Sequence, residues 1–130
     1  MNNLYKVLTT QEWELANSKG FIITELDNKD GFVHLSTSKQ LASTLSLYFS
    51  KFEEVILIQL SYEQIKSNLK LELVDPGSKR SGSFYHLYGD LNIKHACKVW
   101  NLNRGAFALP EEVLLQAELP EKLIGKSIGV

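Results

Sequence analysis

VILIQL, residues 55–60, is an apolar stretch rich in β-branched residues and long enough to form a strand at the centre of a sheet. Residues 61–64 follow it with a helix-capping signature, so a short helical turn should begin there. Residues 69–73 then alternate leucine with Lys70 and Glu72, which is the pattern of a half-buried strand. This region therefore predicts a strand, a helical turn and a second strand.

The segment before this region predicts a strand followed by a helix. Residues 4–8 are apolar and β-like, and Thr9 with Glu12 has the spacing of a helix capping box. Gly20 stands where a C-terminal cap is expected, so the helix should end near Lys19.

A second strand and helix should follow. Residues 27–31 form a polar cluster ending in glycine, which predicts a loop, and residues 32–35 read as a buried strand. Thr37 and Gln40 supply a second capping box, and the helix after them should run to about Ser50. It carries an apolar stripe that should pack on a sheet. The stripe consists of Leu41, Leu45, Tyr48, Phe49 and Phe52.

The C-terminal half predicts a loop, strands and a final helix. Residues 75–83 are rich in Pro, Gly and Ser and should form a mobile surface loop. Residues 84–89 are dense in aromatic side chains, and residues 94–100 read as a strand. Residues 103–105 resemble a hairpin turn, and residues 111–112 follow a proline and should begin a helix.

Composition places the chain among ordinary globular proteins. Its 130 residues are 44% hydrophobic and 22% charged, with a net charge of −1. We expect one α+β domain over residues 1–130, with mixed or antiparallel sheets and two to three helices. The near-neutral charge gives no strong nucleic-acid signal, and the single Cys97 offers neither a disulfide nor a structural metal site. Without a signal peptide or membrane span, we expect a cytoplasmic protein.

Two histidines lie in similar apolar or aromatic settings. His34 follows Phe-Val and His86 follows Phe-Tyr, and each imidazole offers one donor and one acceptor, which suits sugar hydroxyls or proton transfer. The alternative is a pair of buried, structurally bonded histidines. Ser36 and Thr37 precede the next helix and have two possible roles. They either cap that helix, or they bind a carbonyl, hydroxyl or phosphate of a ligand together with the free N–H groups at the start of the helix.

Four further side chains are candidate ligand contacts. Tyr85 and Tyr88 either stack on a flat ring or belong to the core. Lys79 and Arg80 either close over a phosphate or form a solvated charge pair. No Gly-rich dinucleotide fingerprint, phosphate loop, nucleophile elbow or zinc-protease motif occurs, which argues against the enzyme classes that carry them.

Several motifs together resemble one family over nearly the whole chain. They are Asp27, residues 30–36, Tyr48 with Phe49, and residues 84–89. This combination resembles domain of unknown function 952. The resemblance implies a compact α+β fold similar to the ADP-ribosyltransferase superfamily, whose members bind NAD in a cleft between two small sheets.

The resemblance also implies roles for individual residues. His34 matches the superfamily residue that holds the ribose next to nicotinamide, and His86 is a second polar anchor. Tyr85 stands where the family usually has proline, and no late catalytic glutamate is evident. Glu72 is then the candidate carboxylate for the oxocarbenium-like state of glycosidic cleavage.

The function expected from these residues is binding of NAD or an ADP-ribosyl-type nucleotide, with NAD as a substrate, no metal, and ADP-ribosyl transfer or hydrolysis as the activity. Two alternatives stay open. The first is a non-catalytic module that binds another small molecule or a protein, and the second is transfer chemistry on a phosphorylated RNA end. His34, His86 and Tyr88 should line one cleft.

Overall fold

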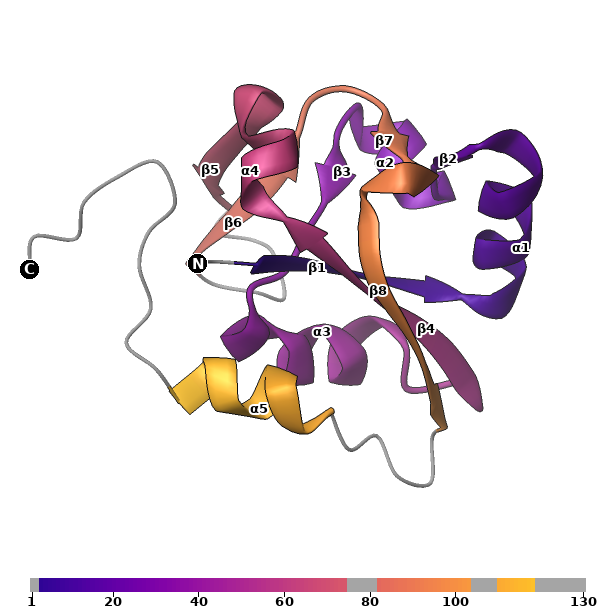
Figure 1. Ribbon diagram of the computed structural model, residues 1–130, viewed down its shortest axis with the longest axis vertical. Helices are drawn as coiled ribbons and strands as arrows, with labels where there is room; N and C mark the ends of the chain where they lie inside the picture. The colour runs from indigo at the N-terminus through magenta and orange to yellow at the C-terminus, as the bar shows by residue number, and fades with distance from the viewer. Residues whose placement is uncertain (1–2, 75–81, 104–109, 119–130) are drawn as a thin grey trace, which may run out of the picture.

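The central feature of the fold is a three-stranded antiparallel sheet in the order β1-β4-β8 (Figure 1). Its middle strand is β4 (Glu54–Ser61), between β1 (Asn3–Thr9) and β8 (Ala96–Asn103). The computed structural model describes residues 3–74, 82–103 and 110–118. Every side chain from Val55 to Leu60 is buried, so the predicted central strand is confirmed.

Both faces of this sheet are covered, which explains why β4 is apolar throughout rather than alternating. One face packs against α3 (Leu41–Tyr48) and α5 (Glu111–Glu118), in a cluster that includes Leu41, Leu57 and Val113. Figure 1 shows these two helices below the sheet. The opposite face packs against α1 (Thr10–Lys19) and the remaining strands.

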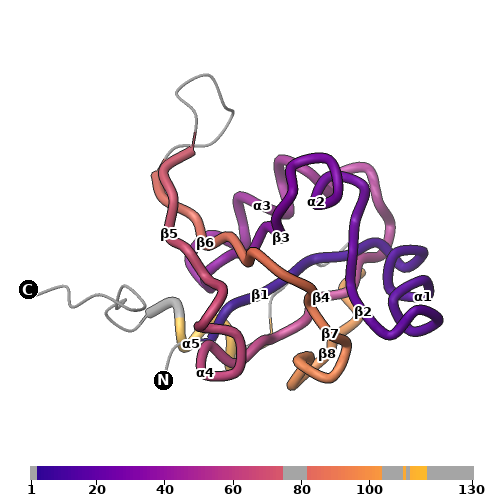
Figure 2. The backbone as a smooth tube through the Cα atoms, turned by 90° about the horizontal axis from the view of Figure 1, so that it is seen from above, coloured from indigo at the N-terminus to yellow at the C-terminus, as the bar shows by residue number. Residues whose placement is uncertain are grey.

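A second three-stranded antiparallel sheet carries the candidate site residues His34, His86 and Glu72. Its order is β3-β6-β5, formed by β3 (Val33–His34), β6 (Ser83–Leu87) and β5 (Leu69–Leu73), which lie side by side in Figure 2. An isolated antiparallel bridge joins it to β1, through Tyr5 N–H to Ser36 O at 2.8 Å and Ser36 N–H to Tyr5 O at 2.9 Å. A two-stranded pair, β2 (Phe21–Ile22) with β7 (Leu91–Asn92), completes the strands described.

The described chain contains five α-helices, not the two to three expected, although the α+β class and the antiparallel sheets are confirmed. One addition, α2 (Glu25–Asp30), occupies the cluster that was predicted to be a loop. Thr24 Oγ1 caps it by accepting from Asp27 N–H at 3.1 Å, and Gly31 ends it at φ 84°. α4 (Tyr62–Ile65) is the helical turn that was expected after β4.

The local capping predictions agree with the structure. Thr9 and Glu12 form the capping box of α1, and Gly20 ends that helix in the left-handed region. α5 begins at Glu111, where a helix start was expected. The predicted hairpin turn at residues 103–105 lies largely outside the described residues. No helix in the described ranges is long and apolar enough to cross a membrane.

The stripe predicted along the second helix divides in two. Leu41 and Leu45 are buried against the central sheet, as expected. Tyr48 and Phe52 are 43% and 41% exposed, so the prediction that they pack on the sheet is wrong. Phe49 packs against the same cluster, as expected. Phe52 lies outside it because α3 ends at Tyr48 and the helical spacing does not continue to residue 52.

Tyr5 gives the fold an expected sensitivity to alkaline pH. Its fully buried phenol donates to Gln59 Oε1 at 3.2 Å, and burial raises its pKa from 10.0 to about 12. This rise corresponds to roughly 3 kcal/mol of unfolding free energy, which is fully present below pH 10 and lost as the pH rises through about 12.

We expect Tyr5→Phe to remove most of this pH dependence. The measurement is the urea midpoint from pH 9 to 12. Tyr62→Phe, at a partly buried tyrosine beside the core, is the matched control and should keep the wild-type profile. Parallel profiles for wild type and Tyr5→Phe would contradict the assignment.

Candidate functional site

The pleat of the β3-β6-β5 sheet brings the candidate side chains onto one face. His34 on β3 lies directly opposite His86 on β6, which lies opposite Lys70 on β5. Glu72 lies opposite Phe84, two residues from His86, and therefore on the same face. Successive residues point to opposite faces, so the neighbours of His86 point into the core.

His34 lies between two carboxylates supplied by α2. Its Nδ1 is 2.6 Å from Asp27 Oδ1, and its Nε2 is 2.9 Å from Asp30 Oδ2. The Asp30 carboxyl is 35% exposed, whereas that of Asp27 is 2% exposed. A ligand atom that bonds to Nε2 must therefore take the place of Asp30 and leave Asp27 undisturbed.

Asp27 is the centre of a buried polar network behind His34. Oδ1 also accepts from the His34 backbone N–H at 3.1 Å, and Oδ2 pairs with Lys6 Nζ at 2.8 Å. Lys6 in turn donates to His34 O at 3.0 Å. Burial alone would raise the pKa of Asp27, but the hydrogen bond from His34 and the charge of Lys6 outweigh it and lower the pKa.

A second polar group is centred on Glu72. Its Oε1 accepts from His86 Nδ1 at 2.7 Å and from Tyr88 OH at 2.7 Å. The bonds from Tyr88 and then His86 lower the pKa of Glu72, whereas burial lowers the pKa of His86. The pair therefore favours an ionised Glu72 and a neutral His86 that donates from Nδ1. This tautomer leaves Nε2 of His86 as an acceptor.

Phe32 joins the two histidine groups. Its ring stacks on His86 with centroids 4.0 Å apart, and lies 4.7 Å from His34 and 5.3 Å from Tyr88. The two imidazoles approach edge to face at 5.5 Å. Sequence reasoning did not select Phe32 as a site residue. Alternation on a strand was the available signal, because Phe32 and His34 are two residues apart.

These groups line a cleft with a volume of about 920 Å³. This size is within the range of about 300–1,000 Å³ that is usual for small-molecule sites. His34, His86 and Tyr88 all line it, as predicted, and Glu72 lines it as well. Further lining side chains come from the end of α3 and from α2. They are Tyr48, Phe49, Phe52, Glu25, Leu26 and Lys29.

The other predicted ligand contacts are placed differently. Ser36 lines the cleft, but it is buried and its Oγ is 2.8 Å from Thr44 Oγ1. Thr37 does not line the cleft, and its backbone N–H donates to Gln40 Oε1 at 3.0 Å, in the predicted capping box.

Tyr85 is in the hydrophobic core, 3% exposed, and does not line the cleft. The physical reason is strand alternation, because Tyr85 is adjacent to His86 and must point to the other face of β6. Lys79 and Arg80 lie outside the described residues. Within the described ranges, no group of three His, Cys, Asp or Glu side chains is placed to hold a metal ion.

Solved structures share this fold. The crystal structure of protein CC0527 from Caulobacter crescentus is 28% identical, with a TM-score of 0.72 over 88% of this chain and 98% of that chain. The solution NMR structure of the same protein is 30% identical, with a TM-score of 0.66 over 79% of this chain and 86% of the other. No curated protein matches the chain.

The family relationship follows from the sequence match. The profile described as protein of unknown function (DUF952) matches residues 7–99, a span that includes both histidine motifs and the α2 carboxylates. The predicted family is thereby confirmed, and the chain belongs to the DUF952 family.

Proposed function

We propose that the chain binds NAD or another ADP-ribosyl-type ligand in this cleft, with the ribose and nicotinamide end against His34, His86 and Tyr88. The observation that carries the proposal is the combination on one wall of two imidazoles, two further aromatic rings and the carboxylate of Glu72. Titratable groups with shifted pKa values inside a cleft are typical of functional sites. A relationship to the ADP-ribosyltransferase superfamily is part of this proposal.

Each group has a role that its geometry supports. Nε2 of His86 accepts from a ribose hydroxyl, because Nδ1 already donates to Glu72. Nε2 of His34 bonds to a second ribose or amide oxygen after displacing Asp30. The rings of Phe32 and Tyr88 offer flat apolar surface to nicotinamide.

The first test is ligand-induced stabilisation. We expect the melting temperature to rise with NAD or ADP-ribose, since a ligand at about 100 times its dissociation constant stabilises by roughly 2.7 kcal/mol. His34→Ala should lose most of this rise, because it removes the ring that faces the ligand. Differential scanning fluorimetry of the unliganded variant shows whether the fold is retained.

The control variant is His95→Ala, which removes a half-buried imidazole from a turn that does not line the cleft. It should keep the full ligand-induced shift. If no adenine nucleotide shifts the wild-type protein at concentrations up to about the millimolar range of weak sites, the NAD proposal is wrong.

A second candidate function is a non-catalytic module on the same fold. Its support is that Asp30 and Glu72 already bond to His34 and His86, so the histidines have structural partners without any ligand. Such a module binds its ligand without breaking a bond. Release of nicotinamide from bound NAD distinguishes an enzyme from such a module.

A further inference from the structure

The charges that line the cleft are predominantly negative. The acidic lining residues are Glu12, Glu25, Asp30 and Glu72. The basic lining residues of the described chain are Lys6 and Lys29, and Lys6 is already paired with the buried carboxylate of Asp27 at 2.8 Å. Carboxylates that line a cleft attract a positively charged group of a ligand.

Aromatic side chains from two parts of the chain line the cleft. Phe32 and Tyr88 belong to the wall that includes β3 and β6, and Tyr48, Phe49 and Phe52 follow from α3. The face of an aromatic ring attracts a cation, and several rings around one space form the usual recognition site for quaternary ammonium groups.

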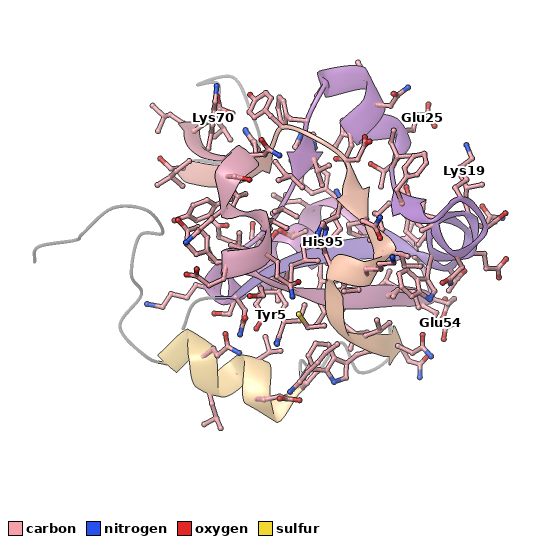
Figure 3. The ribbon with its side chains drawn as sticks, turned by 45° about the horizontal axis from the view of Figure 1, so that its top comes forward. Tyr5, Lys19, Glu25, Glu54, Lys70 and His95 are labelled. Atoms are coloured by element: carbon pink, nitrogen blue, oxygen red, sulfur yellow. The ribbon has the colours of Figure 1, made fainter. Side chains whose placement is uncertain are left out.

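A contact of this kind is present among the described residues, because Lys70 Nζ lies 4.9 Å from the ring centroid of Tyr88. A ligand cation on the same face of this ring must take the place of the Lys70 ammonium. The Tyr88 hydroxyl also donates to Glu72, so ring and carboxylate form one unit in which both parts attract positive charge. In Figure 3, Lys70 of β5 lies at the upper left of the molecule and Glu25 of α2 at the upper right.

We propose that the cleft recognises a small organic cation, with a quaternary ammonium or pyridinium head group held beside Glu72 and Tyr88. The inference goes beyond the proposed function, because it applies to any ligand with such a head group, whether or not that ligand is a nucleotide. For NAD, it places the bond between the pyridinium ring and its ribose beside Glu72. The anionic pyrophosphate then lies toward Lys29, which lines the cleft and is exposed.

The test compares a cation with its uncharged isostere. Choline and 3,3-dimethyl-1-butanol have the same shape, since a carbon atom replaces the nitrogen, and both can be titrated against the full chain by NMR or calorimetry. We expect choline to bind about tenfold more tightly, the factor that corresponds to one strong cation–aromatic or charge contact.

Variants locate the contact. Glu72→Gln keeps the side-chain shape and removes the charge, so it should lower choline affinity about tenfold and leave the isostere unaffected. Tyr88→Leu should also weaken choline. Glu63→Gln is the matched control, because Glu63 is exposed, pairs with Lys66 and does not line the cleft. It should bind choline as the wild type does.

The outcomes separate the two proposals. Equal affinity for choline and its isostere, or no binding of either, overturns the cation inference even if NAD stabilises the protein. Choline binding that is lost in Glu72→Gln, without any response to NAD or ADP-ribose, upholds the inference and refutes the proposed function. A choline response that is unchanged in Glu72→Gln and Tyr88→Leu places the cation elsewhere and also overturns it.

Discussion

Replacing Asp27 with alanine should lower the free energy of unfolding by about 3–5 kcal/mol. The reason is that Lys6, whose side chain is 7% exposed, would remain as a buried ammonium without its counter-charge. His34 would also lose the acceptor of its backbone N–H and of its Nδ1. Removal of one partner of a buried pair costs more than the pair contributes, because the remaining charge is poorly solvated.

Urea denaturation measures this loss, and two variants control it. Asp90→Ala removes an exposed carboxylate and should change stability by no more than about 0.5 kcal/mol. The double variant Asp27→Ala with Lys6→Met removes both charges and should recover part of the loss. Equal stabilities for Asp27→Ala and Asp90→Ala would show that the buried network contributes nothing.

The loss should also depend on pH. The folded-state pKa of Asp27 is lowered from 3.8, so its contribution is fully present above the unfolded value and is lost as the pH falls through the folded value. The difference in stability between wild type and Asp27→Ala should therefore be constant near neutral pH and shrink below about pH 4. A difference that grows on acidification would contradict the shift.

Local signals predicted most of the elements in this fold. The limits of α1 follow from its capping residues, Thr9 and Gly20. The position of β4 follows from a continuous apolar run, which is the pattern of a strand that is buried on both faces. α2 was missed because its six residues show no apolar periodicity, and the residue it buries is Asp27. In the sequence, a polar cluster with one capping residue at Thr24 is typical of a loop. Only the ion pair between Asp27 and Lys6, which forms in the folded protein, shows that this segment is a helix with a buried side chain.

The candidate site was predictable in its residues and less so in its contacts. Histidines in apolar surroundings indicated the cleft, and strand alternation would have separated Tyr85, which faces the core, from Tyr88. Asp30 lies four residues before His34, and it was not predicted as a partner because residues 27–31 were expected to form a loop rather than the end of the helix α2. Glu72 was not predictable as the partner of His86, because it reaches that ring only after β5 pairs with β6. Such pairings between distant segments have no local sequence signal.

The position of Glu72 leads to a second large expected effect, on the cleavage of NAD. When the bond between nicotinamide and ribose breaks, nicotinamide leaves with the bonding electrons as a neutral molecule, and positive charge develops on the ribose until water adds to it. An ionised carboxylate beside the ribose stabilises that charge. Hydrogen bonds from His86 and Tyr88 hold Glu72 in place, and they lower its pKa.

We therefore expect the wild-type protein to release nicotinamide from NAD, and Glu72→Gln to release it about 10²–10³ times more slowly, the usual cost of removing one group that stabilises a developing charge. The rate is followed by chromatography at saturating NAD, so that weaker binding by the variant does not enter the comparison. Glu63→Gln should retain the wild-type rate, because the carboxylate of Glu63 is outside the cleft.

Equal rates in wild type and Glu72→Gln would exclude a catalytic role for the carboxylate of Glu72. If the wild type stabilises on binding NAD and releases no nicotinamide, the pocket holds its ligand as tightly in the ground state as in the transition state, and the non-catalytic module is the correct function.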